Sequence, residues 1–260
     1  MIESIKLLKK IIKKDPIYFV GEYSSYEDAA KHAKGYDADE IFDKCYKAAH
    51  EVYCGNGLFD RDGFTFAEPE QDLSLMCCLY MAYMCTGFLH VLDFGGAFGG
   101  VYNQHKRWLQ SIENLKWYVV EQPRYVDAAE KMQNDTLKFV YSVTEINNCI
   151  NCVLFRSSLE YLPKWKDALL AALEFKPEIV ILDRTWVCDG GEWYSIQNVH
   201  EPIYEASYVI HVFDKRELIK AVTSEGYQLV QEFMPDHWQE FTISGKKVCE
   251  QSFVFQRVEC

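Results

Sequence analysis

The sequence predicts an α/β fold: a mostly parallel sheet with helices on both faces and an antiparallel strand at one edge. From residue 88 onward, apolar segments of strand length alternate with segments of helical length. The last two strand-like segments, 227–233 and 251–258, have no helix between them, which favours an antiparallel pair. Residues 1–86 look helical and without a sheet of their own, so we expect an N-terminal helical cap on an α/β domain over 87–260.

The expected cap contains four helical segments. Residues 2–14 place Ile and Leu on one face and Lys elsewhere, as in an amphipathic helix. Ser24 or Ser25 can cap a second helix, and the Gly- and Asp-rich stretch 54–66 indicates a long loop or a short hairpin. The remaining two helices are expected over 39–52 and 69–86.

The α/β half keeps its alternation almost to the end of the chain. A long connection follows the strand at 178–183. The expected strands are 88–94, 116–121, 137–141, 152–157, 178–183, 227–233 and 251–258, and the expected helices are 101–113, 124–134, 163–175 and 214–225.

Composition excludes some classes of protein. The chain has 260 residues and a net charge of −12, from 27 Lys and Arg against 39 Asp and Glu, and 49% of its residues are hydrophobic. The hydrophobic fraction excludes general disorder, and the negative charge argues against a nucleic-acid partner, because phosphates require a basic face. The charge is uneven, since five Lys and one Glu give residues 1–14 a charge of +4 and leave −16 for the remainder.

The ten cysteines and the basic first segment bear on the compartment. The cysteines are scattered, residues 1–14 lack the apolar core of a secretory signal, and no apolar run reaches the roughly 20 residues that span a bilayer. We therefore expect a cytoplasmic protein with free thiols. Residues 1–14 could hold it weakly to anionic lipid at the inner face of a membrane, or pack on the cap or on a protein partner.

The motif with the clearest chemical meaning is VLDFGGAFGG, residues 91–100. An apolar strand carries Asp93 to its end, and the glycines that follow let the backbone turn sharply and approach a ligand. A tight structural turn is the alternative. Glu121, at the end of the next expected strand, stands where an acid accepts hydrogen bonds from ribose hydroxyls. Together the two features indicate a nucleoside-containing cofactor.

The spacing within the turn favours one cofactor over another. NAD sites use G-x-G-x-x-G to seat a pyrophosphate on a helix N-terminus, and here Ala97 occupies the middle position. S-adenosylmethionine (SAM) carries no phosphate, and its methyltransferases favour an acid two residues before the first Gly. Asp93, Gly95 and Gly99 match that pattern, again with Ala97 at the middle Gly. We predict SAM and keep an NAD-dependent enzyme as the alternative.

Seven stretches spread over nearly the whole chain carry a wider resemblance. They are GEYSSYEDA with GY (21–36), LDFGGAFGGVYNQH (92–105), WYVVEQP (117–123), SSLEYLP (157–163), ILDRT (181–185), IQNVHEPIYEASY (196–208) and GYQLV (226–230). In these the sequence resembles the class I SAM-dependent methyltransferases, which have a Rossmann-like fold, and more narrowly a bacterial group encoded with surface-polysaccharide biosynthesis genes. It departs from that group at Arg184-Thr185-Trp186, where Arg-Thr-Pro is common.

The resemblance implies a set of cofactor contacts at the strand ends. They are Asp93, Gly95, Gly96 and Gly99 along the methionine end, Glu121 at the ribose, Gln122, Pro123 and Ser142 around the adenine, and Ser157 and Ser158 on the sulfonium side. Some have structural alternatives, because Pro123 can start a helix and the two serines at 157–158 can cap one.

Methyl transfer to a hydroxyl also needs a group that takes up the acceptor's proton. Candidates should follow the strand ends, and His200 is favoured because imidazole titrates near neutral pH, with His105 a weaker choice. Arg184 could bind an anionic acceptor or pair with a carboxylate. The full set of catalytic candidates is Glu160, Asp183, Arg184, His200 and Tyr204.

The predicted reaction is O-methylation of a sugar hydroxyl on a surface polysaccharide or its precursor. Trp186, Trp193 and Tyr194 could pack against a sugar or simply staple their loop. A small-molecule O- or N-methyltransferase and a non-catalytic SAM-fold subunit of a glycan-assembly complex are the alternatives. No metal is expected, because the pair Cys149 and Cys152 lacks a second pair of ligands at suitable spacing.

Overall fold

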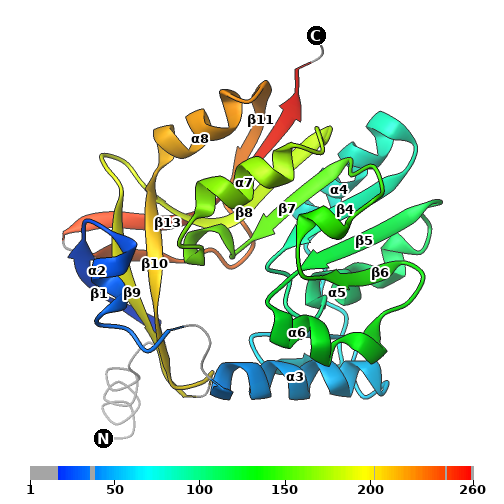
Figure 1. The fold of residues 1–260 in the computed structure, drawn as a ribbon, viewed down its shortest axis with the longest axis horizontal. Coiled ribbons are helices and arrows are strands. Elements are labelled where there is room, and N and C mark those ends of the chain that lie inside the picture. The colour runs from blue at the N-terminus through cyan, green and yellow to red at the C-terminus, as the bar shows by residue number, and fades with distance from the viewer. Residues whose placement is uncertain (1–16, 36–38, 202, 244, 259–260) are drawn as a thin grey trace, which may run out of the picture.

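The computed structural model describes residues 17–35, 39–201, 203–243 and 245–258. The amphipathic helix expected over 2–14 lies outside these residues. One large sheet runs through the described part of the chain, with helices against both of its faces (Figure 1). Within the described residues, no helix combines the length and the apolar character that crossing a bilayer requires.

The centre of the sheet is a mostly parallel run of strands. Its order is β6 (Leu137–Val140), β5 (Leu115–Val120), β4 (Leu89–Phe94), β7 (Cys152–Arg156), β8 (Ile179–Cys188), β13 (Lys246–Arg257) and β11 (Tyr227–Phe233). The pairs from β6 to β8 are parallel, whereas β13 is antiparallel to both of its neighbours β8 and β11. This arrangement confirms the predicted α/β fold with an antiparallel strand near one edge.

The helices form two layers around this sheet. Strand alternation divides the core, since Val91 packs on one face of β4 and Leu92 on the other. The first face carries α4 (Leu73–Thr86), α5 (Gly100–Leu109) and α6 (Pro123–Ala128), and the second carries α7 (Trp165–Leu173) and α8 (Lys215–Thr223). Three short 3-10 turns, Glu130–Met132, Val143–Glu145 and Leu159–Tyr161, follow strands or helices on the way.

The first described residues differ from the expected all-helical cap. Residues Ile17–Tyr23 form a strand, β1, which pairs antiparallel with β9 (Trp193–Val199). Its side chains alternate between half-buried and exposed, which suits an edge strand covered on one face. The pattern was not recognised because the strand depends on β9, about 180 residues away in the chain, for its hydrogen bonds.

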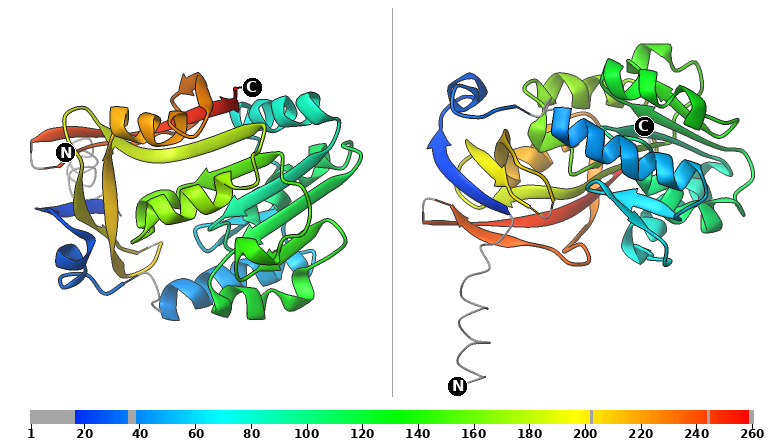
Figure 2. Two further views of the ribbon diagram at one scale, coloured as in Figure 1. Left: turned by 45° about the horizontal axis from the view of Figure 1, so that its top comes forward. Right: turned by 90° about the horizontal axis from the view of Figure 1, so that it is seen from below.

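The long connection expected after residue 183 is also structured. Strand β8 continues to Cys188, and β9 and β10 (Ala206–Asp214) follow as an antiparallel pair. At its end β10 joins β8 in parallel through Phe213 and Asp214. Together β1, β9 and β10 form a small antiparallel group at one end of the molecule (Figure 2). A further short strand, β12 (Glu240–Ile243), pairs with β13.

Other N-terminal expectations are confirmed. Ser25 caps α2 (Tyr26–Ala30) by accepting a hydrogen bond from the Asp28 amide at 3.1 Å. The stretch 54–66 contains a hairpin, β2 (Phe59–Arg61) with β3 (Phe64–Phe66). Helix α3 covers Asp39–Tyr53, close to the expected span, and α4 starts at Leu73 rather than 69, because Asp72 provides its N-cap.

Candidate active site at the carboxyl ends of the strands

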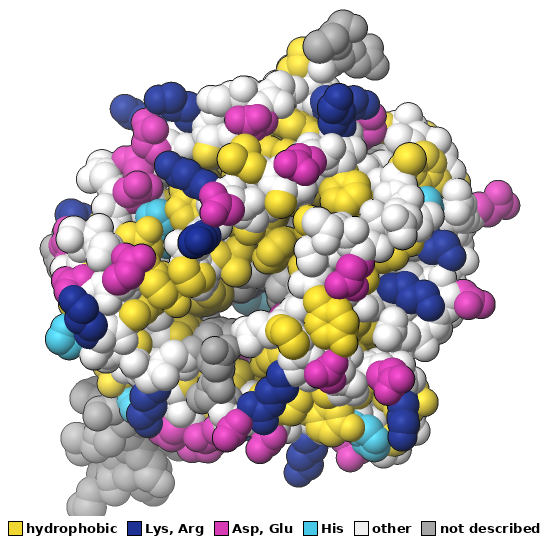
Figure 3. All heavy atoms as spheres, viewed as in Figure 1, with side chains coloured by type: hydrophobic (Ala, Val, Ile, Leu, Met, Phe, Trp, Pro, Cys, Tyr) yellow, Lys and Arg dark blue, Asp and Glu magenta, His cyan; other side chains and the backbone are white. Residues whose placement is uncertain are grey.

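A cavity of about 440 Å³ lies where β4 and β7 end. Its walls come from the turn after β4, the first turns of α5, the ends of β7 and of the first half of β8, the β2–β3 hairpin, residues 70–72 and the loop 236–239. The molecular surface is hollowed near the middle of the face shown in Figure 3, where the strands β4 and β7 point in Figure 1. The cavity is therefore at the edge of the sheet where the sequence predicted ligand binding.

The glycine turn is packed so tightly that side chains are excluded. A Cβ added at Gly95, whose φ is +76°, would lie 2.8 Å from the Cβ of Ser158. A Cβ at Gly96 would lie 2.4 Å from Oδ2 of Asp93. The backbone itself therefore forms this wall of the cavity, as a loop that a ligand approaches closely requires.

Two acids flank the turn, and one of them, Glu121, is hydrogen-bonded to it. The buried Asp93 accepts a hydrogen bond from Nε1 of Trp117 at 2.9 Å, and burial raises the pKa of its carboxyl to about 7. Glu121 accepts hydrogen bonds from the amides of Ala97 at 3.1 Å and Gln122 at 2.7 Å, and burial raises its pKa. Each oxygen of Glu121 keeps capacity for one more donor, so the carboxylate could also bind two ribose hydroxyls.

The remaining predicted cofactor contacts fall into two groups. Ser157 lines the cavity with a φ of +47°, and Ser158 is buried beside Gly95 with no partner for its hydroxyl oxygen. Neither serine caps the following turn through its side chain. Gln122, Pro123 and Ser142 follow β5 and β6 and do not line the cavity. Pro123 starts α6, as its structural alternative holds, and Ser142 caps the turn Val143–Glu145.

The structure separates the predicted catalytic candidates. Arg184 and the buried Tyr204 line the cavity, whereas Glu160, Asp183 and His200 do not. His200 lies after β9, where its Nδ1 is 2.7 Å from Glu205 and its ring stacks on Tyr18. The weaker candidate His105 is buried within α5 and accepts the Asp72 amide through Nε2. The geometry thus brings neither histidine to the cavity.

The aromatic residues expected in an acceptor loop lie elsewhere. Trp186 and Trp193 are buried in the core of the β8–β10 region, and Tyr194 stacks on His211 with ring centroids 4.4 Å apart. None of the three lines the cavity. All three lie in strands β8 and β9 and not in a loop.

Asp183 takes part in an ion-pair network beside the cavity wall. The guanidinium of Arg156, at the end of β7, contacts Asp183 and is 2.9 Å from Asp72, the cap of α4. Ser252 on β13 donates its hydroxyl to Asp183. All four side chains are buried or nearly so. The network ties α4, β7, β8 and β13 together, and Arg156 and Asp72 were not recognised in the sequence because the two are 84 residues apart.

Arg184 pairs with a carboxylate, the second of its two expected roles. Its Nη2 is 3.0 Å from Glu250, and its Nη1 donates to the main-chain oxygen of Asp236 at 2.8 Å. Glu250 in turn accepts a hydrogen bond from the Gln239 amide at 3.0 Å. These contacts anchor the loop 236–239, which brings His237 to the cavity. No sequence pattern singled out His237.

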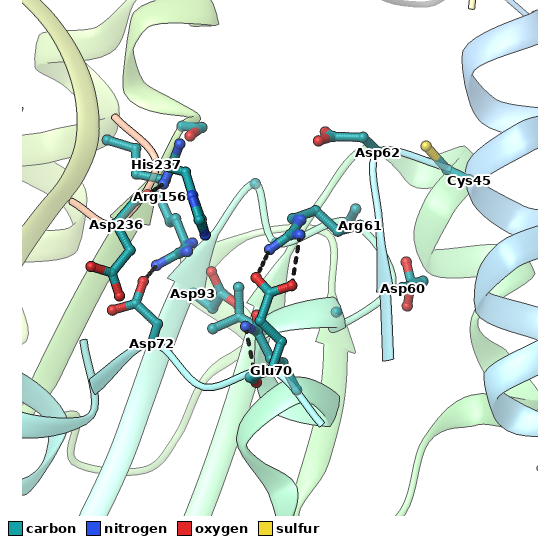
Figure 4. Close-up of a pocket in the computed structure, with 18 of the residues that line it drawn as sticks. Cys45, Asp60, Arg61, Asp62, Glu70, Asp72, Asp93, Arg156, Asp236 and His237 are labelled. Carbon is teal, nitrogen blue, oxygen red and sulfur yellow. Dashed lines mark hydrogen bonds and ion pairs between the residues drawn. The ribbon is translucent and has the colours of Figure 1, made fainter. Parts of the chain in front are cut away.

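Charge within the cavity is predominantly negative. Six carboxylates and three guanidinium groups line it, namely Asp60, Asp62, Glu70, Asp72, Asp93 and Asp236, with Arg61, Arg156 and Arg184. In Figure 4, Arg156, Asp236 and His237 lie on one side, Cys45, Asp60 and Asp62 lie on the other, and the Arg61–Glu70 pair lies between them. The Gly- and Asp-rich stretch 54–66 was the only sequence signal for the hairpin carboxylates.

The environment of Glu160 leads us to expect that the stability of the protein depends on pH. It is 1% exposed, its carboxyl oxygens have no hydrogen-bond partner in the described part of the chain, and burial raises its pKa to about 8. The folded protein therefore keeps a proton that the unfolded chain releases above pH 5, so the free energy of unfolding should fall as the pH rises from 5 to 8, by at most about 1.4 kcal/mol per unit. Glu160→Gln should flatten this slope in denaturant unfolding at pH 5, 6, 7 and 8.

The exposed Glu174→Gln variant is the matched control, since it removes the same charge from the surface. It should keep the wild-type slope. Equal slopes in all three proteins would contradict the assignment of a raised pKa to Glu160.

The comparisons with known proteins concern the fold. No protein-family model and no curated protein sequence matches this chain. The N-terminal domain of EvdMO1, crystallised in the presence of SAH and D-fucose, aligns with a TM-score of 0.50 at 16% identity, over 84% of this chain and 97% of that chain. A 1,6-didemethyltoxoflavin-N1-methyltransferase from Burkholderia thailandensis, with SAH bound, gives a TM-score of 0.44 at 12% identity, over 84% of this chain and 86% of that chain. An S-adenosylmethionine-dependent methyltransferase from Clostridium acetobutylicum gives a TM-score of 0.46 at 8% identity, over 73% of this chain and 93% of that chain. The sheet order and the EvdMO1 match show a Rossmann-like α/β fold of the kind found in SAM-dependent methyltransferases.

Proposed function

We propose that this protein is a SAM-dependent methyltransferase whose acceptor is a sugar hydroxyl of a surface polysaccharide or its precursor. One observation carries the proposal: the glycine turn after β4 forms a wall of the cavity and is clamped from the next strand by Glu121. The similarity in fold to the N-terminal domain of EvdMO1 supports both the cofactor and a sugar acceptor, since that domain was crystallised in the presence of SAH and D-fucose.

The residues present fit the cofactor. Glu121 has spare acceptor capacity for ribose, Gly95 and Gly96 have room only for backbone, and the lining is rich in carboxylates, which favour a cation. When bound, SAM supplies a methyl group on a sulfonium sulfur. The protein's part is to align the acceptor oxygen, the methyl carbon and the sulfur on one line.

His237 is the cavity residue best suited to take the acceptor's proton. Its loop is fixed by Arg184 and Glu250, and it lies across the cavity from the hairpin. A neutral imidazole nitrogen accepts the hydroxyl proton as the oxygen attacks, and the exposed ring then releases it to solvent. Tyr204, buried in the cavity lining, is placed to contact the acceptor.

Binding experiments test the cofactor. The protein is titrated with SAM, SAH and NAD by calorimetry, and SAM and SAH should bind while NAD should not. Binding of NAD alone would overturn the proposal in favour of a dehydrogenase. Incubation with methyl-labelled SAM and either sugars or small amines then tests the acceptor, and label found only in the amines would refute the sugar assignment.

Replacing Glu121 with Ala should raise the dissociation constant of SAM about 100-fold or more. The change removes two charge-assisted hydrogen bonds to ribose, each of which contributes on the order of 1.5 kcal/mol, and releases the Ala97 amide. Glu130→Ala, an exposed change of equal charge, is the control. An unchanged dissociation constant in Glu121→Ala would refute the ribose role.

A further inference from the structure

Asp60 on β2 has an unusual environment for a carboxylate. It is 8% exposed, and its Oδ1 has no hydrogen-bond partner among the residues that the structure describes. It nevertheless lines the cavity, beside Cys45 and on the far side of the Arg61–Glu70 pair from Arg156 (Figure 4). Buried carboxylates are normally paired or hydrogen-bonded, because burial without a partner is costly. A buried carboxylate with an unsatisfied oxygen, in a residue that lines a cavity, therefore points to a ligand that carries a donor.

The charged side chains of the cavity wall do not satisfy Asp60. Arg61 pairs with Glu70 through both of its terminal nitrogens. Arg156 contacts Asp72 and Asp183, and Arg184 contacts Glu250. Each guanidinium that lines the cavity is thus already paired within the described residues, and the complementary cation has to come from the ligand.

The N-terminus of α5 lies directly beside Asp60. A Cβ added at Gly100 would be 2.5 Å from the main-chain oxygen of Asp60 and 3.6 Å from its Oδ1, so only glycine allows this approach. Gly100, Val101 and Gln104 line the same cavity. The first amides of a helix have no partner within it and carry a partial positive charge, which suits an anion. A negative and a positive site therefore lie next to each other.

We propose that Asp60 and the first turn of α5 bind the amino-acid end of the cofactor, the ammonium on Asp60 and the carboxylate on the helix N-terminus. This inference rests on the proposed function and adds to it a binding residue contributed by the N-terminal hairpin. It also explains why an acid is buried opposite a helix start. An ammonium and a carboxylate attached to the same carbon atom match the two neighbouring sites in charge.

The hairpin is held rigidly enough to position Asp60. Phe59 and Phe66 stack with ring centroids 4.8 Å apart, and Arg61 lies over the Phe66 ring at 4.9 Å. Burial raises the pKa of Asp60 to about 7, and a bound ammonium would restore its ionised form. A preorganised carboxylate loses little freedom on binding.

Calorimetry with three ligands tests the assignment on the full chain. SAM and SAH share the amino-acid end, whereas 5′-methylthioadenosine keeps the adenosine and thioether and lacks that end. Asp60→Asn should weaken SAM and SAH at least tenfold and leave 5′-methylthioadenosine within twofold. Asp43→Asn, an exposed change of the same charge, should leave all three unchanged.

Three results would overturn the inference. The first is an unchanged affinity of Asp60→Asn for SAH. The second is a loss of affinity for 5′-methylthioadenosine equal to the loss for SAM and SAH. The third is a loss of affinity for SAM without one for SAH, which would place Asp60 at the sulfonium. A melting temperature of Asp60→Asn no lower than that of the wild type would show that the variant is folded, so that a loss of affinity reflects the binding site and not misfolding. If wild-type protein binds neither SAM nor SAH, the proposed function fails, and this inference fails with it.

Discussion

Replacing His237 with Gln should lower the rate constant of methyl transfer at least 100-fold while leaving the affinity for SAH within about twofold. General-base catalysis by a positioned histidine contributes roughly 10²- to 10⁴-fold. Gln keeps a polar group of similar reach and cannot take up the proton. The measurement is the turnover of methyl-labelled SAM at saturating acceptor, with the pH–rate profile recorded for both proteins. The limb that reports the base should disappear in the variant.

The sequence favoured His200 for the same role, so His200→Gln is the discriminating comparison. His200 lies outside the cavity, where it contacts Glu205 and Tyr18, and its replacement should keep the rate within fivefold of the wild type. A large loss in His200→Gln together with a normal rate in His237→Gln would reverse the assignment.

Replacing Arg156 with Met should lower the free energy of unfolding by about 3–5 kcal/mol. Met fills similar volume but leaves Asp72 and Asp183 without their common cation, and both carboxylates are buried. The cost is that of uncompensated charge rather than of a lost contact. Denaturant unfolding of the two proteins at neutral pH measures it.

Two further variants separate charge from packing in that experiment. Lys220→Met breaks an exposed pair with Glu217 on α8 and should cost no more than about 0.5 kcal/mol. Adding Asp72→Asn and Asp183→Asn to Arg156→Met should recover part of the lost stability, because the unpaired charges are then gone. A loss that the two Asn changes leave untouched would show that packing of the Arg156 side chain is responsible.

The central strands were predictable because their pattern is local. The end of strand β4 and the turn after it lie within ten consecutive residues, 91–100, and the apolar runs that form β5, β7 and β8 are buried on both faces. The predicted span of α3 was close for a similar reason, since a helix makes its hydrogen bonds within one segment.

The antiparallel extension was not predictable in the same way. In the sequence of strand β1, apolar and polar residues alternate only weakly, and a glycine stands at a break in its register. Strands β9 and β10 lie in a region that the sequence indicated to be a long connection. Each of these strands finds its hydrogen-bond partners only after the chain has folded. The arrangement of β1 against β9 joins residues 17–23 to 193–199, which no short window of sequence contains.

The same division holds for the site. The sequence by itself predicted the glycine turn and Asp93, which line the cavity, and Glu121, which accepts the Ala97 amide, because strand ends in a parallel sheet meet at one edge and neighbouring strands follow each other in the chain. Only the tertiary structure decided that Asp60 and His237 reach the cavity and that Arg156 joins Asp72 to Asp183. These contacts involve loops and residues that are far apart in the sequence. They form because of charge and burial in the folded chain, so no local pattern of residues predicts them.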